Sequence, residues 1–231
     1  MIKLKLRVGD SPITRDNQEF SMLSILTTLA AIIGCLALVI IFLSALSPRK
    51  LEYTETITID APVGDVYDDI RFQDRLMRWS AWPKETKSKC AVDIRHTIEG
   101  EDGAVGTRTV FFSKGKAMGF QEIQSLRPNH SVTFTLEGAG PPHFPTMVFL
   151  LEELTPEKTK VVLAFTNRMP PPFNLIWNFA GISKWTRKMH VKDLAGLKAF
   201  SEPPHKDANG TIVGREMSVP NPYEIKMPEG A

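Results

Sequence analysis

The hydrophobic pattern begins with one long apolar run near the N-terminus. No charged residue lies between Glu19 and Arg49, and residues 22–46 are apolar apart from scattered serine and threonine. As a helix this stretch rises about 37 Å, more than the roughly 30 Å of a bilayer's hydrocarbon core. A secretory signal has a shorter apolar core and a small-residue cleavage site, and no such site precedes Pro48. The run therefore predicts a retained single-pass transmembrane helix over residues 22–46.

Basic residues flank this run unequally. Several precede it within residues 1–21, whereas Arg49 and Lys50 alone follow it closely. Because lysine and arginine stay on the cytoplasmic side, residues 1–21 are predicted to be cytoplasmic, with the helix in the cell (inner) membrane. The rest of the chain is then periplasmic or otherwise extracytoplasmic. The basic residues before the run are Lys3, Lys5, Arg7 and Arg15.

Beyond residue 50 the pattern changes to short segments that alternate polar and apolar residues, as half-buried strands do. The first is residues 53–60, and two short helices, 63–70 and 73–79, are predicted after it. Turn residues such as Lys114-Gly115 and Pro128-Asn129 separate the later segments. Short strands joined by tight turns predict an antiparallel sheet. The remaining strands are predicted at residues 90–98, 106–112, 117–126, 131–136, 146–154 and 160–166.

A long helix is predicted over residues 173–200, because apolar residues recur there at helical spacing. Its second half is basic on the opposite face, which is either a solvated surface or one that contacts anionic lipid headgroups. Residues 201–231 are proline-rich and polar, and they predict an extended tail. The apolar face is predicted to consist of Leu175, Phe179, Ile182, Met189, Leu197 and Phe200.

The order of these elements predicts an α+β domain over residues 52–200, preceded by the transmembrane helix. In it, a curved seven-stranded antiparallel sheet wraps around the long C-terminal helix. A wide curved sheet cannot fill the space beside one helix, so a cavity is expected between them, where apolar ligands usually bind.

Five short motifs stand out in this region: Ile57–Val63 with Val66-Tyr67, Trp79-x-x-Trp82-Pro83, Gly103-x-x-Gly106-Thr107, Glu122-Ile123 before Pro128, and Met189–Lys198. In their order and spacing they resemble the START-like, helix-grip superfamily (SRPBCC proteins), in particular its polyketide cyclase/dehydrase type. The similarity covers roughly residues 52–200. It implies a pocket for a lipid or another hydrophobic molecule, adapted in some members for cyclase or aromatase chemistry. The superfamily has no shared catalytic motif, so no catalytic residue is implied.

Strand alternation and helix periodicity predict which residues line the cavity. Glu122 is either a desolvated carboxylate inside it or a solvated residue on the outer face of its strand. Trp79 and Trp82 either pack the short helices onto the sheet or form the rim of the pocket. The full set of predicted lining residues is Trp79, Trp82, Phe111, Phe120, Glu122, Phe134, Phe149, Trp177, Trp185 and Met189.

Composition and charge narrow the chemistry further. The net charge of +2 gives no basic field of the kind that nucleic-acid binders carry, so no nucleic-acid partner is expected. No histidine, cysteine or carboxylate set has metal-ligand spacing, and no nucleophile motif is present. We therefore expect no metal, cofactor or catalytic residue.

Three functions are compatible with these sequence features. The first is a membrane-tethered module that binds a lipid or other hydrophobic small molecule in its cavity. The second is an enzyme of cyclase or aromatase type. The third is an accessory subunit of a larger membrane protein complex, since Gly34 lies among alanines that would let another helix approach closely.

Overall fold

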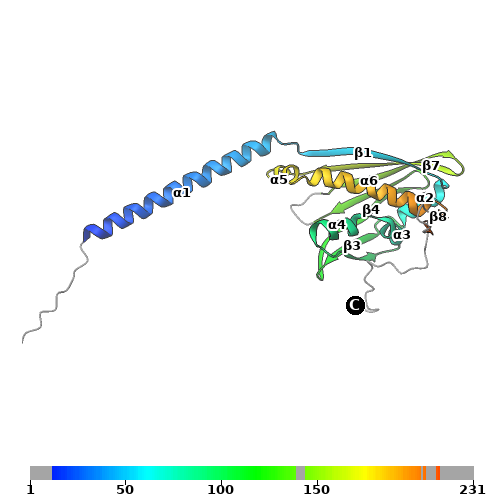
Figure 1. The fold of residues 1–231 in the computed structure, drawn as a ribbon, viewed down its shortest axis with the longest axis horizontal. Helices are drawn as coiled ribbons and strands as arrows, with labels where there is room; N and C mark the ends of the chain where they lie inside the picture. Colours follow the sequence, from blue (N-terminus) through cyan, green and yellow to red (C-terminus); the bar gives the residue numbers. More distant parts are fainter. Residues whose placement is uncertain (1–11, 139–143, 204, 207–211, 214–231) are drawn as a thin grey trace, which may run out of the picture. The chain divides into compact units, whose positions relative to one another are not determined.

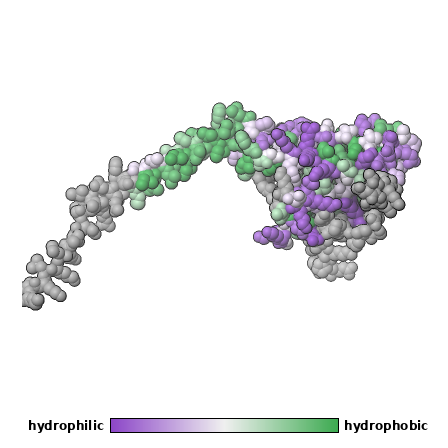
Figure 2. Space-filling view, viewed as in Figure 1, coloured by the Kyte–Doolittle hydropathy of each residue, from purple (hydrophilic) through white to green (hydrophobic). Residues whose placement is uncertain are grey.

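The computed structural model describes residues 12–138, 144–203, 205–206 and 212–213. It divides the chain into two compact units, residues 1–47 and residues 48–231. The first unit contains the helix α1 (Pro12–Leu46). Its segment Ser24–Leu46 is long and apolar enough to cross a membrane, a criterion that a membrane anchor and a signal sequence both meet. Figure 2 shows hydrophobic residues over this segment.

The second unit is built on one seven-stranded antiparallel sheet with the strand order β1-β7-β6-β5-β4-β3-β2. β1 therefore pairs with the last long strand, β7, and the other strands follow one another as hairpins. This confirms the predicted antiparallel α+β fold. The strands are β1 (Lys50–Ile59), β2 (Arg95–Glu99), β3 (Arg108–Ser113), β4 (Lys116–Arg127), β5 (Ser131–Glu137), β6 (Thr146–Thr155) and β7 (Lys158–Arg168), and a separate pair is formed by β8 (His205–Lys206) and β9 (Ile212–Val213).

Among the described residues of this unit, five helices accompany the sheet, and the longest crosses one of its faces (Figure 1). The helices are α2 (Val63–Arg71), α3 (Gln73–Trp79), α4 (Trp82–Cys90), α5 (Phe173–Phe179) and α6 (Ile182–Ser201). Between the sheet and α6 lies a core of fully buried side chains, which include Phe134, Phe149, Ile123, Leu163 and Leu197.

One predicted helix and one predicted strand need correction. The helix predicted over residues 173–200 is two helices, because Gly181 adopts a left-handed conformation (φ +67°) that ends α5 and begins α6. The strand predicted from residue 90 begins only at Arg95, because Cys90 is the last residue of α4 and residues 91–94 have no regular secondary structure. The described part of the predicted tail contains β8 and β9, and most of the tail lies outside the described residues.

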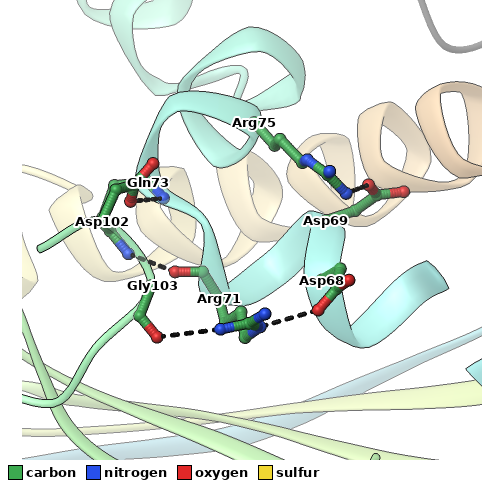
Figure 3. A network of polar contacts seen from close by, with 7 residues as sticks. All are labelled: Asp68, Asp69, Arg71, Gln73, Arg75, Asp102 and Gly103. Atoms are coloured by element: carbon green, nitrogen blue, oxygen red, sulfur yellow. Dashed lines mark hydrogen bonds and ion pairs between the residues drawn. The ribbon is translucent and has the colours of Figure 1, made fainter. Parts of the chain in front are cut away.

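A polar network holds α2 and α3 at their junction (Figure 3). The Asp102 carboxylate accepts hydrogen bonds from the backbone N–H groups of Gln73 (2.6 Å) and Asp74 (3.3 Å), which would otherwise lack partners at the start of α3. The buried carboxylate of Asp69 pairs with Arg75 at 3.2 Å. The backbone carbonyl of Asp69 accepts from Trp79 Nε1 at 2.9 Å, so this network fixes the indole of Trp79.

Candidate functional site

A pocket of about 240 Å³ lies between the sheet and helices α3, α4, α5 and α6. Most of its wall is apolar or aromatic, and all four tryptophans of the chain border it. A predominantly apolar wall with a few polar groups is typical of small-molecule sites. The apolar lining consists of Leu76, Met77, Trp79, Trp82, Phe111, Met118, Phe120, Leu136, Pro145, Met147, Phe149, Phe165, Trp177, Ile182, Trp185 and Met189.

The structure brings eight of the ten predicted lining residues to this pocket, and their role in binding stays a prediction. Trp79 and Trp82 both line the pocket and pack against neighbouring rings. The ring of Trp79 contacts Phe149 edge-on at 6.3 Å, and the ring of Trp82 lies 4.5 Å from that of Phe111. The eight are Trp79, Trp82, Phe111, Phe120, Phe149, Trp177, Trp185 and Met189.

Two predicted lining residues lie elsewhere. Phe134 is completely buried in the core, where its ring contacts Phe149 edge-on at 6.1 Å. Glu122 is not among the residues that line the pocket: it lies on the outer face of β4, where its side chain is 17% exposed and forms an ion pair with Arg108.

A bulge in β4 explains the position of Glu122. Phe111 pairs with Gly119 and Phe112 pairs with Ala117, so Met118 is an extra residue without a partner on β3. The bulge shifts the alternation by one residue, and Met118 borders the pocket while Glu122 faces outward. A Cβ at Gly119 would lie 2.0 Å from the carbonyl oxygen of Glu137, so only glycine fits at this bulge.

Phe120 lies between the pocket and the outer face of β4. It borders the pocket, but alternation after the bulge places it on the face of Glu122. The guanidinium carbon of Arg108 lies 4.6 Å from the centroid of its ring, which is a cation–π distance. Phe120 is thus a weaker pocket candidate than Phe111 or Phe149.

Polar groups gather on the α6 side of the pocket. The buried imidazole of His190 borders it, and His190 Nδ1 forms a hydrogen bond of 2.8 Å with the hydroxyl of Tyr53 on β1. Burial lowers the pKa of His190 to about 4, so this imidazole is neutral near pH 7. Burial, together with the nearby Glu55 charge, raises the pKa of Tyr53 well above its usual value, so its hydroxyl keeps its proton and is also neutral.

Asp193, one helical turn beyond His190, is the second polar group on this side. Its Oδ1 accepts hydrogen bonds from Ser80 Oγ (3.1 Å) and from the backbone N–H of Ala81 (2.7 Å), directly before α4. Burial raises the pKa of Asp193 to about 6, and the hydrogen bonds from Ala81 and Ser80 oppose this increase. Asp193 therefore links α6 to the start of α4 and carries a negative charge at pH 7.

The sequence prediction missed these polar residues, although their spacing contains the signal. Thr186, His190, Asp193 and Leu197 recur at intervals of three or four residues on the same helical face as Met189. Only apolar residues were assigned to that face. Extending it to polar residues at the same spacing would have included Thr186, His190 and Asp193, all of which border the pocket.

Metal-ligating residues do not gather in the part of the chain that the structure describes, where no group of three or more histidine, cysteine or acidic residues could hold an ion. His96 is buried in β2, and neither of its ring nitrogens has a hydrogen-bond partner among the described residues. Burial lowers the pKa of His96 to about 4, so it is neutral near pH 7.

No family model matches the chain, and no curated protein matches it. Solved structures do resemble it. A protein from Chromobacterium violaceum shares 17% identity over 66% of this chain and 98% of its own, with a TM-score of 0.47. The di-domain ARO/CYC BexL from the BE-7585A biosynthetic pathway shares 19% identity over 66% of this chain and 48% of its own, with a TM-score of 0.46.

An HSP90 activator from Plasmodium falciparum is also similar, with 15% identity over 52% of this chain and 74% of its own, and a TM-score of 0.38. The ARO/CYC protein and the HSP90 activator have different roles, and all three identities are below 25%. No function for this chain follows from them. The fold itself rests on the strand order and on the long C-terminal helix of this chain.

Proposed function

We propose that the chain is a membrane-tethered, START-like module that holds a lipid or another hydrophobic small molecule in the pocket between the sheet and α6. The observation that carries this proposal is the lining itself, in which aromatic and aliphatic side chains surround about 240 Å³. Ligand pockets commonly measure about 300–1,000 Å³, so we expect a small hydrophobe or one chain of a larger lipid. The apolar segment of α1 is the proposed tether, with residues 1–21 in the cytoplasm and the domain outside it.

The polar groups of the pocket support a neutral ligand that carries a hydroxyl group. Neither lysine nor arginine lines the pocket among the described residues, whereas Asp193 and Glu137 do. A fatty-acid carboxylate would therefore meet negative charge with no compensating cation. The neutral imidazole of His190 and the carboxylate of Asp193 instead offer hydrogen bonds to an alcohol or a phenol.

Extraction of the purified full-length chain with organic solvent, followed by mass spectrometry, tests this proposal. We expect a stoichiometric neutral hydrophobe. In Met189→Trp and Met118→Trp the added indole fills the pocket, so most of the bound molecule should be lost. Val191→Trp is the matched control, because Val191 is an exposed residue of the same helix. The absence of a hydrophobe from the parent protein, or equal amounts in filled and control variants, would contradict the proposal.

The second candidate is an enzyme of cyclase or aromatase type, which the pair His190 and Asp193 on the pocket wall favours. An enzyme should leave product in the parent protein and unreacted substrate in His190→Gln. A binding module should contain the same molecule in both proteins. The masses of the extracted molecules therefore separate these two functions.

A further inference from the structure

One short helix at the surface of the second unit exposes an unusual amount of apolar area. On α5, Phe173, Ile176 and Phe179 are exposed by 42%, 60% and 81%, respectively. Their spacing of three residues places them on one side of the helix. Large side chains exposed together in this way mark a surface that binds a partner or a membrane.

A neighbouring side of α5 contributes to the wall of the pocket. Trp177 lies one residue from Ile176, about 100° around the helix, and it lines the pocket together with Ile182 and Trp185 of α6. One helix thus presents an aromatic wall to the candidate ligand site and an apolar face to the outside.

The residues that follow the apolar segment in the sequence, Pro48 and Arg49, are held beside this helix. The segment ends at Leu46, and Pro48 follows after a distance of at most about 7 Å. Asn178 of α5 donates a hydrogen bond from Nδ2 to the carbonyl oxygen of Pro48 at 3.0 Å, and Ser183 Oγ donates to Asn178 Oδ1 at 3.2 Å. The backbone N–H of Met169 donates to the carbonyl oxygen of Arg49 at 2.9 Å.

α5 and the residue after β7 therefore fix residues 48 and 49 to the domain, and the start of α6 holds Asn178 in place. Figure 1 shows α5 beside the beginning of β1. If α1 crosses a bilayer, covalent connectivity alone keeps α5 close to the surface from which the segment emerges.

The charges around α5 complement anionic lipid headgroups. Lys184 and Lys188 are exposed on the first turns of α6 and have no ion pair among the described residues. Arg49 and Arg168 are exposed where β1 begins and β7 ends. Apolar side chains surrounded by basic residues are typical of helices that lie in the membrane interface.

We propose that α5 inserts its exposed face, Phe173, Ile176 and Phe179, into the lipid interface and thereby places the pocket wall at the bilayer from which the ligand enters. The occupant of this face is an anionic bilayer. This inference rests on the membrane tether of the proposed function, and it adds a second contact with the membrane and a route for the ligand.

A fluorescent label at position 179 of the full-length chain tests the inference. In a background with Cys35→Ser and Cys90→Ser, Phe179→Cys is labelled with a nitrobenzoxadiazole dye, and the protein is reconstituted into vesicles of phosphatidylcholine and phosphatidylglycerol. Leu154→Cys is the matched control. Leu154 is also an exposed apolar residue (46%), but it lies near the opposite end of β1, about 30 Å along the strand.

An interfacial helix buries its apolar face about 5–10 Å deep, so brominated acyl chains should quench the dye at 179 about twofold and leave the dye at 154 unchanged. Adding Ile176→Ser should abolish quenching at 179, because the inserted face loses its central side chain. Equal quenching at both positions, or quenching that persists with Ile176→Ser, overturns the inference.

The two proposals fail in distinguishable ways. A quenched dye at 179 with no extractable hydrophobe supports the interfacial helix and overturns the binding function. A bound hydrophobe with an unquenched dye at 179 supports the binding function and overturns the interfacial helix. A chain that does not float with the vesicles overturns both the tether and the interfacial helix.

Discussion

The buried carboxylate of Asp193 should make the stability of the domain depend on pH in a defined direction. Its pKa is raised by burial from an ordinary 3.8 to about 6. The folded protein then holds this proton more tightly than the unfolded chain does, so the free energy of unfolding falls as pH rises through this window. The protonated carboxyl contributes about 3 kcal/mol to the free energy of unfolding at pH values below 3.8. About 2 kcal/mol of this remains at pH 4.5 and is lost by pH 7.5.

Two buried histidines act in the opposite direction. Burial lowers the pKa of His96 and of His190 from 6.5 to about 4, so each contributes stability that increases as pH rises from about 4 to 6.5. The pH profile of the parent protein is thus a sum of opposing contributions. Asp193→Asn isolates one of them, because both histidines remain and the amide oxygen can still accept from Ser80 and Ala81.

The measurement is chemical unfolding of the full-length chain in detergent between pH 4.5 and pH 7.5. Tryptophan fluorescence reports on the domain, since all four tryptophans border the pocket and none lies in α1. Relative to the parent protein, Asp193→Asn should gain about 2 kcal/mol over this range. The same substitution at the exposed Asp65 should leave the difference constant. Parallel profiles for the parent protein and Asp193→Asn would refute the reasoning.

Two further substitutions test the packing around the pocket. Phe134→Ala removes a fully buried ring and should cost about 3–5 kcal/mol of unfolding free energy, whereas Phe111→Ala, beside the pocket, should cost less and reduce the amount of extractable hydrophobe; equal costs with unchanged ligand content would contradict this. Gly196→Ala should lower the free energy of unfolding by about 1–3 kcal/mol, because its Cβ would lie 2.4 Å from the carbonyl oxygen of Trp79. In the same denaturant titration Gly64→Ala should be neutral or stabilising, because its Cβ has space in α2.

The parts of the fold that depend on local pattern could be predicted from the sequence. Alternation predicted β1, and turn residues such as Lys114-Gly115 separated the strands in the observed order. Helix α4 escaped prediction because its start is stabilised by a distant residue: Asp193 accepts from the N–H of Ala81, 112 positions away in sequence. The bulge at Met118 escaped because an extra residue in one strand is defined only by pairing with its neighbour.

The break at Gly181 shows how one local feature determines both faces of α5. In a continuous helix, Phe179 would fall on the same face as Thr186 and Met189 and would point into the pocket. The left-handed conformation of Gly181 ends that continuity. Trp177 lines the pocket instead, and Phe179 is exposed by 81%. Because of this one glycine, Trp177 takes the place of Phe179 at the candidate ligand site, and Phe179 is free to contact lipid. The interfacial role proposed for α5 thus depends on the same backbone conformation as the aromatic wall of the pocket.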